Sequence, residues 1–212
     1  MTYAIPLFDL NFDSAELRAA RRVLQSRWLT MGPETEAFEA EFAAFIGRRH
    51  AIAVSSCTAA LHLAYEAVGA RGGEVICPSL TFVATAAAAI LAGADPVLAD
   101  IESLEHPTLS PEDAARRVGG RTRALCLMHY GGMACDAEAF QALARQRKLA
   151  LVEDCAHSPG ATLHGGALGT FGDVACFSFF SNKNLATGEG GMICCDDDEL
   201  ARRMRLLRSH GM

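Results

Sequence analysis

The sequence predicts an α/β fold, a mainly parallel sheet of seven strands with helices covering both of its faces. Two observations predict this fold class. Short runs that are apolar throughout alternate along the chain with longer amphipathic segments, and such runs are typical of strands buried on both faces of a parallel sheet. The chemically distinctive residues also fall where these runs end, and open α/β sheets bind their ligands at strand ends.

Seven apolar runs are the expected strands. They lie at residues 51–56, 74–78, 95–100, 123–129, 149–154, 174–180 and 191–195. Segments of helical periodicity separate them, at 58–70, 81–94, 110–118 and 136–148. In the first of these, Leu61, Ala64, Tyr65 and Val68 recur at helical spacing. The basic stretch RRMRLLR (202–208) is interpreted as the solvated face of one more amphipathic helix.

One uncharged stretch, residues 75–94, is long enough to raise the question of a membrane span. However, Pro78, Ser79, Thr81, Thr85 and Gly93 interrupt it, and alanine supplies much of its apolar character. We therefore expect a short strand, a turn at 78–79 and then a buried helix. A membrane is not an expected partner.

Composition narrows the class of protein further. The 212 residues are 50% hydrophobic and 21% charged, which is enough for one sizeable core. The net charge of −6 and the lack of a basic run interleaved with aromatics argue against a nucleic-acid partner. The eight cysteines form no C-x-x-C pair, so we expect buried free thiols and no metal site. With no signal peptide at the N-terminus, these thiols predict a cytoplasmic protein.

Three strand-end features carry candidate chemistry. Thr58 opens the helix that follows the first strand, and a helix N-terminus is an anion site. Asp154 closes the strand at 149–154, and His157 follows it. Lys183 lies in FSFFSNKNLATGEGG (177–191), between aromatics and glycines that allow close backbone approach. Taken singly, each also has a plain structural interpretation, as a helix cap, a salt-bridge partner, a core histidine or a surface lysine.

Together these residues match the needs of one cofactor. Pyridoxal phosphate (PLP) requires an amine for a Schiff base, a carboxylate to keep its ring nitrogen protonated, and hydrogen-bond donors for its phosphate. Neither a G-x-x-x-x-G-K-[ST] P-loop nor a G-x-G-x-x-G fingerprint is present to favour a nucleotide instead. The sequence therefore indicates a PLP site.

Four spaced motifs make a family resemblance visible. They are SSCTAALHLA, PSLTFVATAAAAILAGADPVLADIE, VEDCAHSPGA and FSFFSNKNLATGEGGM. In this order they resemble the signatures of the DegT/DnrJ/EryC1/StrS family of PLP-dependent sugar aminotransferases, whose architecture is that of fold type I. The similarity runs from WLTMGPETEAFEAEFA to LRSHGM, which is nearly the whole chain. It implies that the expected sheet is mixed as well as mainly parallel.

The resemblance implies a role for each residue of the catalytic group. Lys183 would form the Schiff base with the cofactor and shuttle the proton between substrate carbon and cofactor. Asp154 would pair with the pyridinium nitrogen. His157 stands where family members carry Gln or His near the cofactor's phenolic oxygen. Deoxysugar dehydratases that resemble this family replace the lysine with histidine, so Lys183 favours transamination.

The remaining cofactor contacts also follow from the resemblance. Thr58 and Ala59 would offer backbone N–H groups to the phosphate, with the Thr58 hydroxyl and Ser178 as further phosphate ligands. Phe82 falls at the family's aromatic position and would stack on the pyridine ring, although a phenylalanine in TFVAT could also be a core residue.

The implied reaction transfers an amino group from an amino acid, most often L-glutamate, to a keto-sugar, typically a nucleotide-linked keto-deoxyhexose. One alternative acceptor is a cyclitol or another cyclic ketone. A different class of function is a PLP-binding module that is inactive without a complementing partner.

The resemblance also implies an organisation of the chain. Residues 1–212 would comprise an N-terminal segment and the PLP-binding large domain, because family members continue past SHGM into a smaller C-terminal domain. We expect a homodimer, since fold-type-I sites lie at two-fold interfaces, and a C-terminal polypeptide is a further candidate partner.

Overall fold

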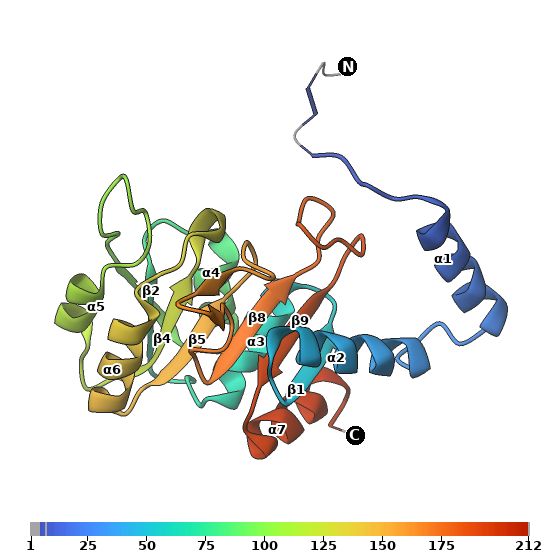
Figure 1. Cartoon of the computed structure of the whole chain (residues 1–212). Coiled ribbons are helices and arrows are strands. Elements are labelled where there is room, and N and C mark those ends of the chain that lie inside the picture. Colours follow the sequence, from blue (N-terminus) through green and yellow to red (C-terminus); the bar gives the residue numbers. More distant parts are fainter. Residues whose placement is uncertain (1–4, 7, 212) are drawn as a thin grey trace.

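The computed structural model describes residues 5–6 and 8–211 and is built around a seven-stranded mixed sheet (Figure 1). The strand order is β1-β9-β8-β5-β4-β2-β3. The sheet comprises β1 (His50–Val54), β2 (Glu74–Pro78), β3 (Asp95–Ala99), β4 (Thr122–Met128), β5 (Ala150–Asp154), β8 (Val174–Ser178) and β9 (Gly191–Cys195). β9 runs antiparallel to both of its neighbours, and the other pairings in the sheet are parallel.

The predicted fold class and all seven predicted strands are confirmed. The differences lie at the strand ends. The run expected at 51–56 leaves the sheet after Val54, because Ser56 already serves as the N-cap of the next helix. The run expected at 174–180 ends at Ser178, where the chain enters a loop. A short hairpin that the sequence did not reveal, β6 (Thr162–Leu163) with β7 (Gly166–Ala167), lies outside the main sheet.

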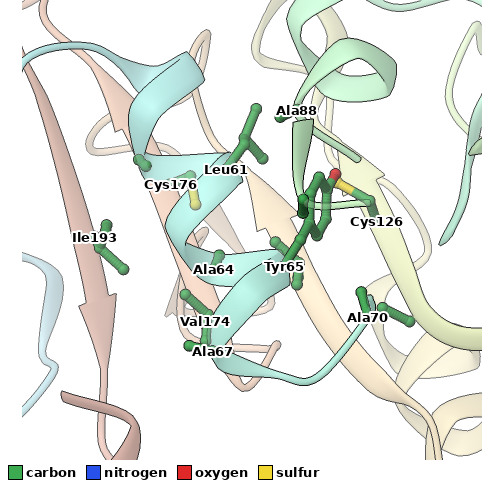
Figure 2. Close-up of a cluster of buried hydrophobic side chains, with 14 of the residues drawn as sticks. Leu61, Ala64, Tyr65, Ala67, Ala70, Ala88, Cys126, Val174, Cys176 and Ile193 are labelled. Atoms are coloured by element: carbon green, nitrogen blue, oxygen red, sulfur yellow. The ribbon is translucent and has the colours of Figure 1, made fainter. Parts of the chain in front are cut away.

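Helices cover both faces of the sheet, as predicted. One face is covered by α3 (Cys57–Ala67), α4 (Val83–Leu91) and α7 (Asp198–Arg208). The other is covered by α2 (Pro33–Ile46), α5 (Pro111–Arg117) and α6 (Ala137–Arg147). Figure 2 shows how α3 meets the sheet, with the ring of Tyr65 extending toward Cys126 of β4 and Cys176 of β8 on the other side of the helix. The inner strands are apolar because they contribute side chains to a core on both faces, whereas the edge strand β3 packs on one face and leaves Leu98 exposed.

Two of the helical expectations need comment. The helix predicted within 81–94 exists as α4, but it is not buried all round. Thr85, Ala88 and Ala89 are buried, whereas Val83 and Ile90 on its other side are exposed. The basic stretch at 202–208 does belong to an amphipathic helix, α7, which buries Ala201 and Met204. Within the described part of the chain, every helix is too short or too polar to cross a membrane.

Two N-terminal helices were not assigned from the sequence. α1 (Ser14–Ser26) begins with a capping box formed by Asp13 and Glu16, and none of its residues is buried. It projects away from the body together with the segment before it (Figure 1). α2 has Pro33 in its first turn and ends at Gly47, which adopts a left-handed conformation. The residues that cap α1 and α2 are visible in the sequence, but helical periodicity alone did not predict these two helices.

The end of β5 sends two carboxylates in opposite directions. Leu151 packs in the core beneath α6 and Val152 in the core beneath α3. Because side chains alternate along a strand, Glu153 shares the α6 side and Asp154 the α3 side. Both carboxylates are buried.

Glu153 binds backbone groups from a neighbouring loop. Its Oε1 accepts the N–H groups of Phe171 and Gly172 at 2.8 and 2.6 Å, and its Oε2 accepts that of Gly169 at 2.9 Å. His129 lies with Nε2 3.0 Å from Oε2. Burial alone would raise the pKa of Glu153, but the hydrogen bonds from His129, Gly172 and Gly169 hold it below its usual value. Glu153 therefore joins β4, β5 and the loop before β8 as a buried anion.

Arg48 completes this network from the segment before β1. It donates from Nε to the carbonyl of Gly169 at 2.8 Å and pairs with Asp196 at 2.8 Å, and its Nη2 lies 3.9 Å from Glu153. Four separate segments thus depend on the Glu153 site.

We predict that Glu153→Ala lowers the free energy of unfolding by about 3–5 kcal/mol, because it leaves buried donors and a buried cation without their acceptor. Glu153→Gln should also destabilise the protein, since its amide NH₂ would face other donors. Urea unfolding measures both changes.

The matched control is Glu138→Gln, because Glu138 makes a comparable contact, 3.1 Å from His164, but on the surface. It should change stability little. A Glu153→Gln protein as stable as the parent would contradict the role assigned to this network.

Candidate functional site

A cavity of about 340 Å³ opens where β5, β8 and β9 meet the first turn of α3. The carboxyl ends of β5 and β8 lie there, which is the edge where open α/β sheets bind ligands. Six of the seven residues predicted for the site line it, namely Thr58, Phe82, Asp154, His157, Ser178 and Lys183. Ala59, the seventh, is not among the lining residues.

Asp154 lies in the interior of the cavity wall. Its Oδ2 accepts a hydrogen bond from the Thr85 hydroxyl at 2.7 Å, and its Oδ1 accepts the N–H of Ala156 at 3.1 Å. Burial raises the pKa of Asp154, while Thr85, Ala156, His157 and Lys183 oppose that rise. A carboxylate in this position is suited to pair with a cationic group of a ligand.

Lys183 enters the cavity from the loop between β8 and β9. Its backbone N–H donates to the carbonyl of Phe180 at 2.9 Å, and the amide of Phe179 donates to Gly190 at 2.9 Å, so both ends of the loop are tied. Burial lowers the pKa of Lys183, although the charge of Asp154 counteracts it. A lowered pKa leaves more of the amine unprotonated and therefore nucleophilic.

Two glycines after Lys183 occupy positions where a side chain would be strained or would clash. Gly188 adopts φ of +92°, in the left-handed region. At Gly191, a Cβ atom would lie 2.5 Å from the carbonyl carbon of Ser56 and 2.7 Å from the amide nitrogen of Cys57. Only a glycine lets the start of β9 pass this close to the first turn of α3. The Lys183 loop and the helix N-terminus are thereby held together.

The first turn of α3 offers an anion site. Ser56 caps the helix by accepting the N–H of Ala59 at 3.1 Å. The amides of Cys57 and Thr58 precede the first possible intrahelical acceptor, so the helix itself does not satisfy them. Ser178, which also lines the cavity, closes β8. These donors at the positive end of a helix fit a phosphate group.

Ala59 lies outside the lining of this cavity. Its amide is committed to Ser56, and its side chain faces a second hollow of about 430 Å³ on another side of α3. That hollow is lined by Met31, Thr35, Ala53, Val54, Ser55, Ala59, His62, Leu63, Leu207 and Arg208.

His157 presents one particular ring nitrogen to the cavity. Its Nδ1 lies 3.2 Å from the backbone nitrogen of Gly131, which donates to it. Burial and then the charge of Lys183 lower the pKa of His157, whereas Asp154 opposes the change. The neutral ring therefore carries its proton on Nε2 and can donate from there. The turn that holds Gly131, η1 (Tyr130–Gly132), was not predicted from the sequence.

Phe82 lies at the rim of the cavity and is 65% exposed. This exposure disagrees with the alternative interpretation of Phe82 as a core residue. An aromatic ring that borders a cavity and remains accessible can form one wall for a planar ligand.

Thr85 is the residue of this site that sequence reasoning missed. It was noted only as a polar interruption of an apolar stretch. The one available signal was its position in the Ala-rich helix, where buried neighbours flank it at helical spacing.

A cluster elsewhere resembles a metal site in composition. His129, Glu153 and Cys155 have ligand atoms within 4.8 Å of one another. Hydrogen bonds already use both ring nitrogens of His129 and both carboxylate oxygens of Glu153. The cluster therefore serves the structural network of Glu153.

We predict that Gly191→Ala destabilises the protein by about 1–3 kcal/mol, because the added methyl group must displace the first turn of α3. Urea unfolding measures the loss. Gly120→Ala is the matched control, since its added Cβ meets nothing within 4 Å and its φ lies outside the left-handed region. Equal stability of the two variants would contradict the close contact between β9 and α3.

Comparison with known proteins identifies the family. The model of the DegT/DnrJ/EryC1/StrS aminotransferase family matches residues 11–212. Spore coat polysaccharide biosynthesis protein SpsC of Bacillus subtilis (strain 168) is 44% identical over 213 residues, covering 100% of this chain and 54% of that protein. GDP-perosamine synthase of Vibrio cholerae is 39% identical over 210 residues, covering 98% of this chain and 57% of that protein.

Solved structures agree with this assignment. S. venezuelae DesV, determined in complex with a ketimine intermediate, superimposes with a TM-score of 0.92 and 42% identity, covering 100% of this chain and 58% of that one. The chain thus spans about half the length of the relatives it matches. Its mixed sheet and flanking helices match the large domain of fold-type-I aminotransferases. The chain belongs to the DegT/DnrJ/EryC1/StrS aminotransferase family.

Proposed function

We propose that this chain is the PLP-binding large domain of an aminotransferase that moves an amino group from an amino acid to a keto-sugar. The observation that carries the proposal is one cavity shared by the Lys183 amine, the buried Asp154 carboxylate and the first turn of α3. Lysine, carboxylate and phosphate donors are the three groups that PLP requires, and PLP is the cofactor of this family.

When bound, PLP supplies an aldehyde and a ring that accepts the electron pair released from the donor's α-carbon. Asp154 would keep a proton on the ring nitrogen. His157 would donate from Nε2 to the ring oxygen. Lys183 would attach the aldehyde through Nζ and later move the proton of the substrate carbon. Phe82 would cover the ring and keep water from it.

The phosphate would bind at the first turn of α3. The amides of Cys57 and Thr58, the hydroxyl of Thr58 and that of Ser178 are its proposed donors. This set keeps Thr58 and Ser178 from the sequence-based prediction and replaces the amide of Ala59 with that of Cys57, because Ser56 already occupies Ala59.

The names of two relatives support a sugar as amino acceptor. One is a spore coat polysaccharide biosynthesis protein and the other a GDP-perosamine synthase. We propose L-glutamate as the donor and a nucleotide-linked keto-deoxyhexose as the acceptor. The cytoplasmic location also stays a proposal, supported by eight cysteines that are all free and buried.

We further propose a homodimer. Exposed apolar side chains lie on the segments that border the cavity, namely Leu80, Phe82, Val83, Phe180 and Leu185. Such a patch is typical of an interaction surface, and two-fold symmetric pairs are the commonest oligomers.

We predict that PLP followed by borohydride labels Lys183. The chain has two lysines, so Lys148, exposed at the end of α6, is an internal control. Because burial lowers the pKa of Lys183, labelling should accelerate with pH and level off below the value of about 10.4 typical of free lysine. Peptide mapping by mass spectrometry locates the label.

Variants sharpen this experiment. Lys183→Ala should lose the label and Lys148→Ala should retain it. Labelling of Lys148 in preference to Lys183 would overturn the proposed attachment site.

We predict that the 212-residue chain sediments as a dimer and binds PLP better than it turns over substrate. Its relatives are nearly twice as long, and residues outside the matched half are proposed to orient the keto-sugar. Orientation of reactants accounts for about 7–11 kcal/mol of a barrier, so poor orientation slows turnover severely.

The measurements are sedimentation velocity, the glutamate half-reaction, and keto-sugar amination with and without the polypeptide encoded immediately downstream. Restoration of turnover by that polypeptide would favour the partner-dependent module. Full turnover by a monomer would contradict the proposed assembly.

A further inference from the structure

Thr85 is a fully buried hydroxyl in an otherwise apolar helix. α4 consists of alanine, valine, isoleucine and leucine apart from this residue. A buried hydroxyl is costly unless it is hydrogen-bonded, and alanine would fit the pattern of its neighbours. The Thr85 hydroxyl must therefore have hydrogen-bond partners within the protein.

The hydroxyl contacts Asp154 and one other side chain. Thr85 Oγ1 lies 2.7 Å from Asp154 Oδ2 and 2.7 Å from Thr81 Oγ1. The Thr85 carbonyl accepts a hydrogen bond from the hydroxyl of the buried Tyr65 at 3.1 Å. Tyr65 thus anchors the backbone of Thr85, and the side chain bridges Thr81 and Asp154.

The chemistry of these groups fixes the direction of the bonds. An ionised carboxylate only accepts, and a threonine hydroxyl has one hydrogen. When Asp154 is an anion, Thr85 donates to it, and the Thr81 hydroxyl, which also lies 2.9 Å from Met128 Sδ, can donate its single hydrogen to Thr85. The two hydroxyls then form a directed chain that ends at the carboxylate.

No other fixed donor side chain among the described residues lies within hydrogen-bonding distance of Asp154 Oδ2. The titratable groups that face Asp154 are Cys57 and Tyr65 on α3, Cys126 on β4, Cys176 on β8, and His157 and Lys183 at the cavity. Burial raises the pKa of the three thiols and of the Tyr65 hydroxyl, so these groups stay neutral and add no negative charge beside Asp154. The hydrogen bonds that favour the anion are those from Thr85, from the amide of Ala156 and from the Cys57 thiol, whose sulfur lies 3.9 Å from Oδ1.

We propose that Thr85 is a positioning residue, whose hydroxyl, oriented by Thr81, holds Asp154 as an anion aimed into the cavity. This deepens the proposed function, because the anion is the form that pairs with a protonated ring nitrogen. Tyr65 fixes the backbone from which Thr85 reaches Asp154.

The first test uses protein without PLP and so does not depend on catalysis. Protein labelled with ¹³C in its aspartate carboxyl groups is titrated by NMR, and Asp154→Asn identifies the Asp154 signal. Thr85→Val keeps the shape of the side chain but removes the donor. It should raise the apparent pKa of Asp154 by about one unit or more, since hydrogen bonds to charged groups are the stronger ones.

Two matched variants accompany it. Thr85→Ser restores the hydroxyl and should restore the titration of the parent. Thr122→Val removes another buried hydroxyl, which accepts the amide N–H of Gly119 at 2.9 Å. Thr122 lies at the opposite end of β4 from Met128, the neighbour of Asp154, so this variant should leave Asp154 unchanged. An unchanged pKa in Thr85→Val would overturn the proposal.

If Thr85→Val does not fold, Thr81→Val decides the question. Thr81 is only partly buried, so this variant removes the outer hydroxyl of the chain with less disturbance. It should raise the pKa of Asp154 by a smaller amount, and no movement would overturn the proposal.

A second readout uses PLP-loaded protein. Thr85→Val should slow the glutamate half-reaction about tenfold with unchanged glutamate KM and PLP content, and Thr85→Ser should recover the rate. If PLP fails to label Lys183, the proposed function fails, whereas the titration without PLP still decides the role of Thr85.

Discussion

The alternation of side chains at the end of β5 is the constraint on which the rest of the site depends. Glu153 and Asp154 are neighbours in sequence but lie on opposite faces of the sheet. Glu153 is saturated by His129 and by backbone amides, so it has no capacity left for a ligand. Asp154 takes fewer hydrogen bonds and faces the cavity. The hydrogen bonds of Glu153 therefore fix the end of β5, and Asp154 faces the cavity from this fixed strand end.

A second constraint links the two halves of the site that are distant in sequence. The first turn of α3 and the Lys183 loop are more than a hundred residues apart, yet β9 passes against Ser56 with no room for a side chain at Gly191. Because the loop is also tied at Phe179 and Gly190, a shift of α3 would move Lys183 as well. The anion site and the amine are thus coupled by packing, and only a glycine satisfies that packing.

The sequence predicted those features that depend on local pattern. Strands buried on both faces are apolar throughout, so all seven were found. Lys183 and Asp154 stand at strand ends, where position alone favoured a ligand site. Features that depend on side-chain geometry could not be predicted from the sequence. The Ser56 hydroxyl accepts the amide N–H of Ala59. Thr85 donates to Asp154 from a helix whose sequence indicates only apolar packing. Neither hydrogen bond can be predicted from the order of polar and apolar residues in the sequence.

The inner wall of the cavity and its rim differ in how they are built. The cofactor side of the cavity is built from strand ends and helix termini that the core holds rigidly. Its rim, in contrast, carries Phe82 and Phe180 with large apolar areas in contact with solvent, and α1 buries none of its residues. Burial of such surface is the dominant favourable term in association. The exposed apolar rim beside the cavity therefore supports the proposed homodimer, because association would bury it.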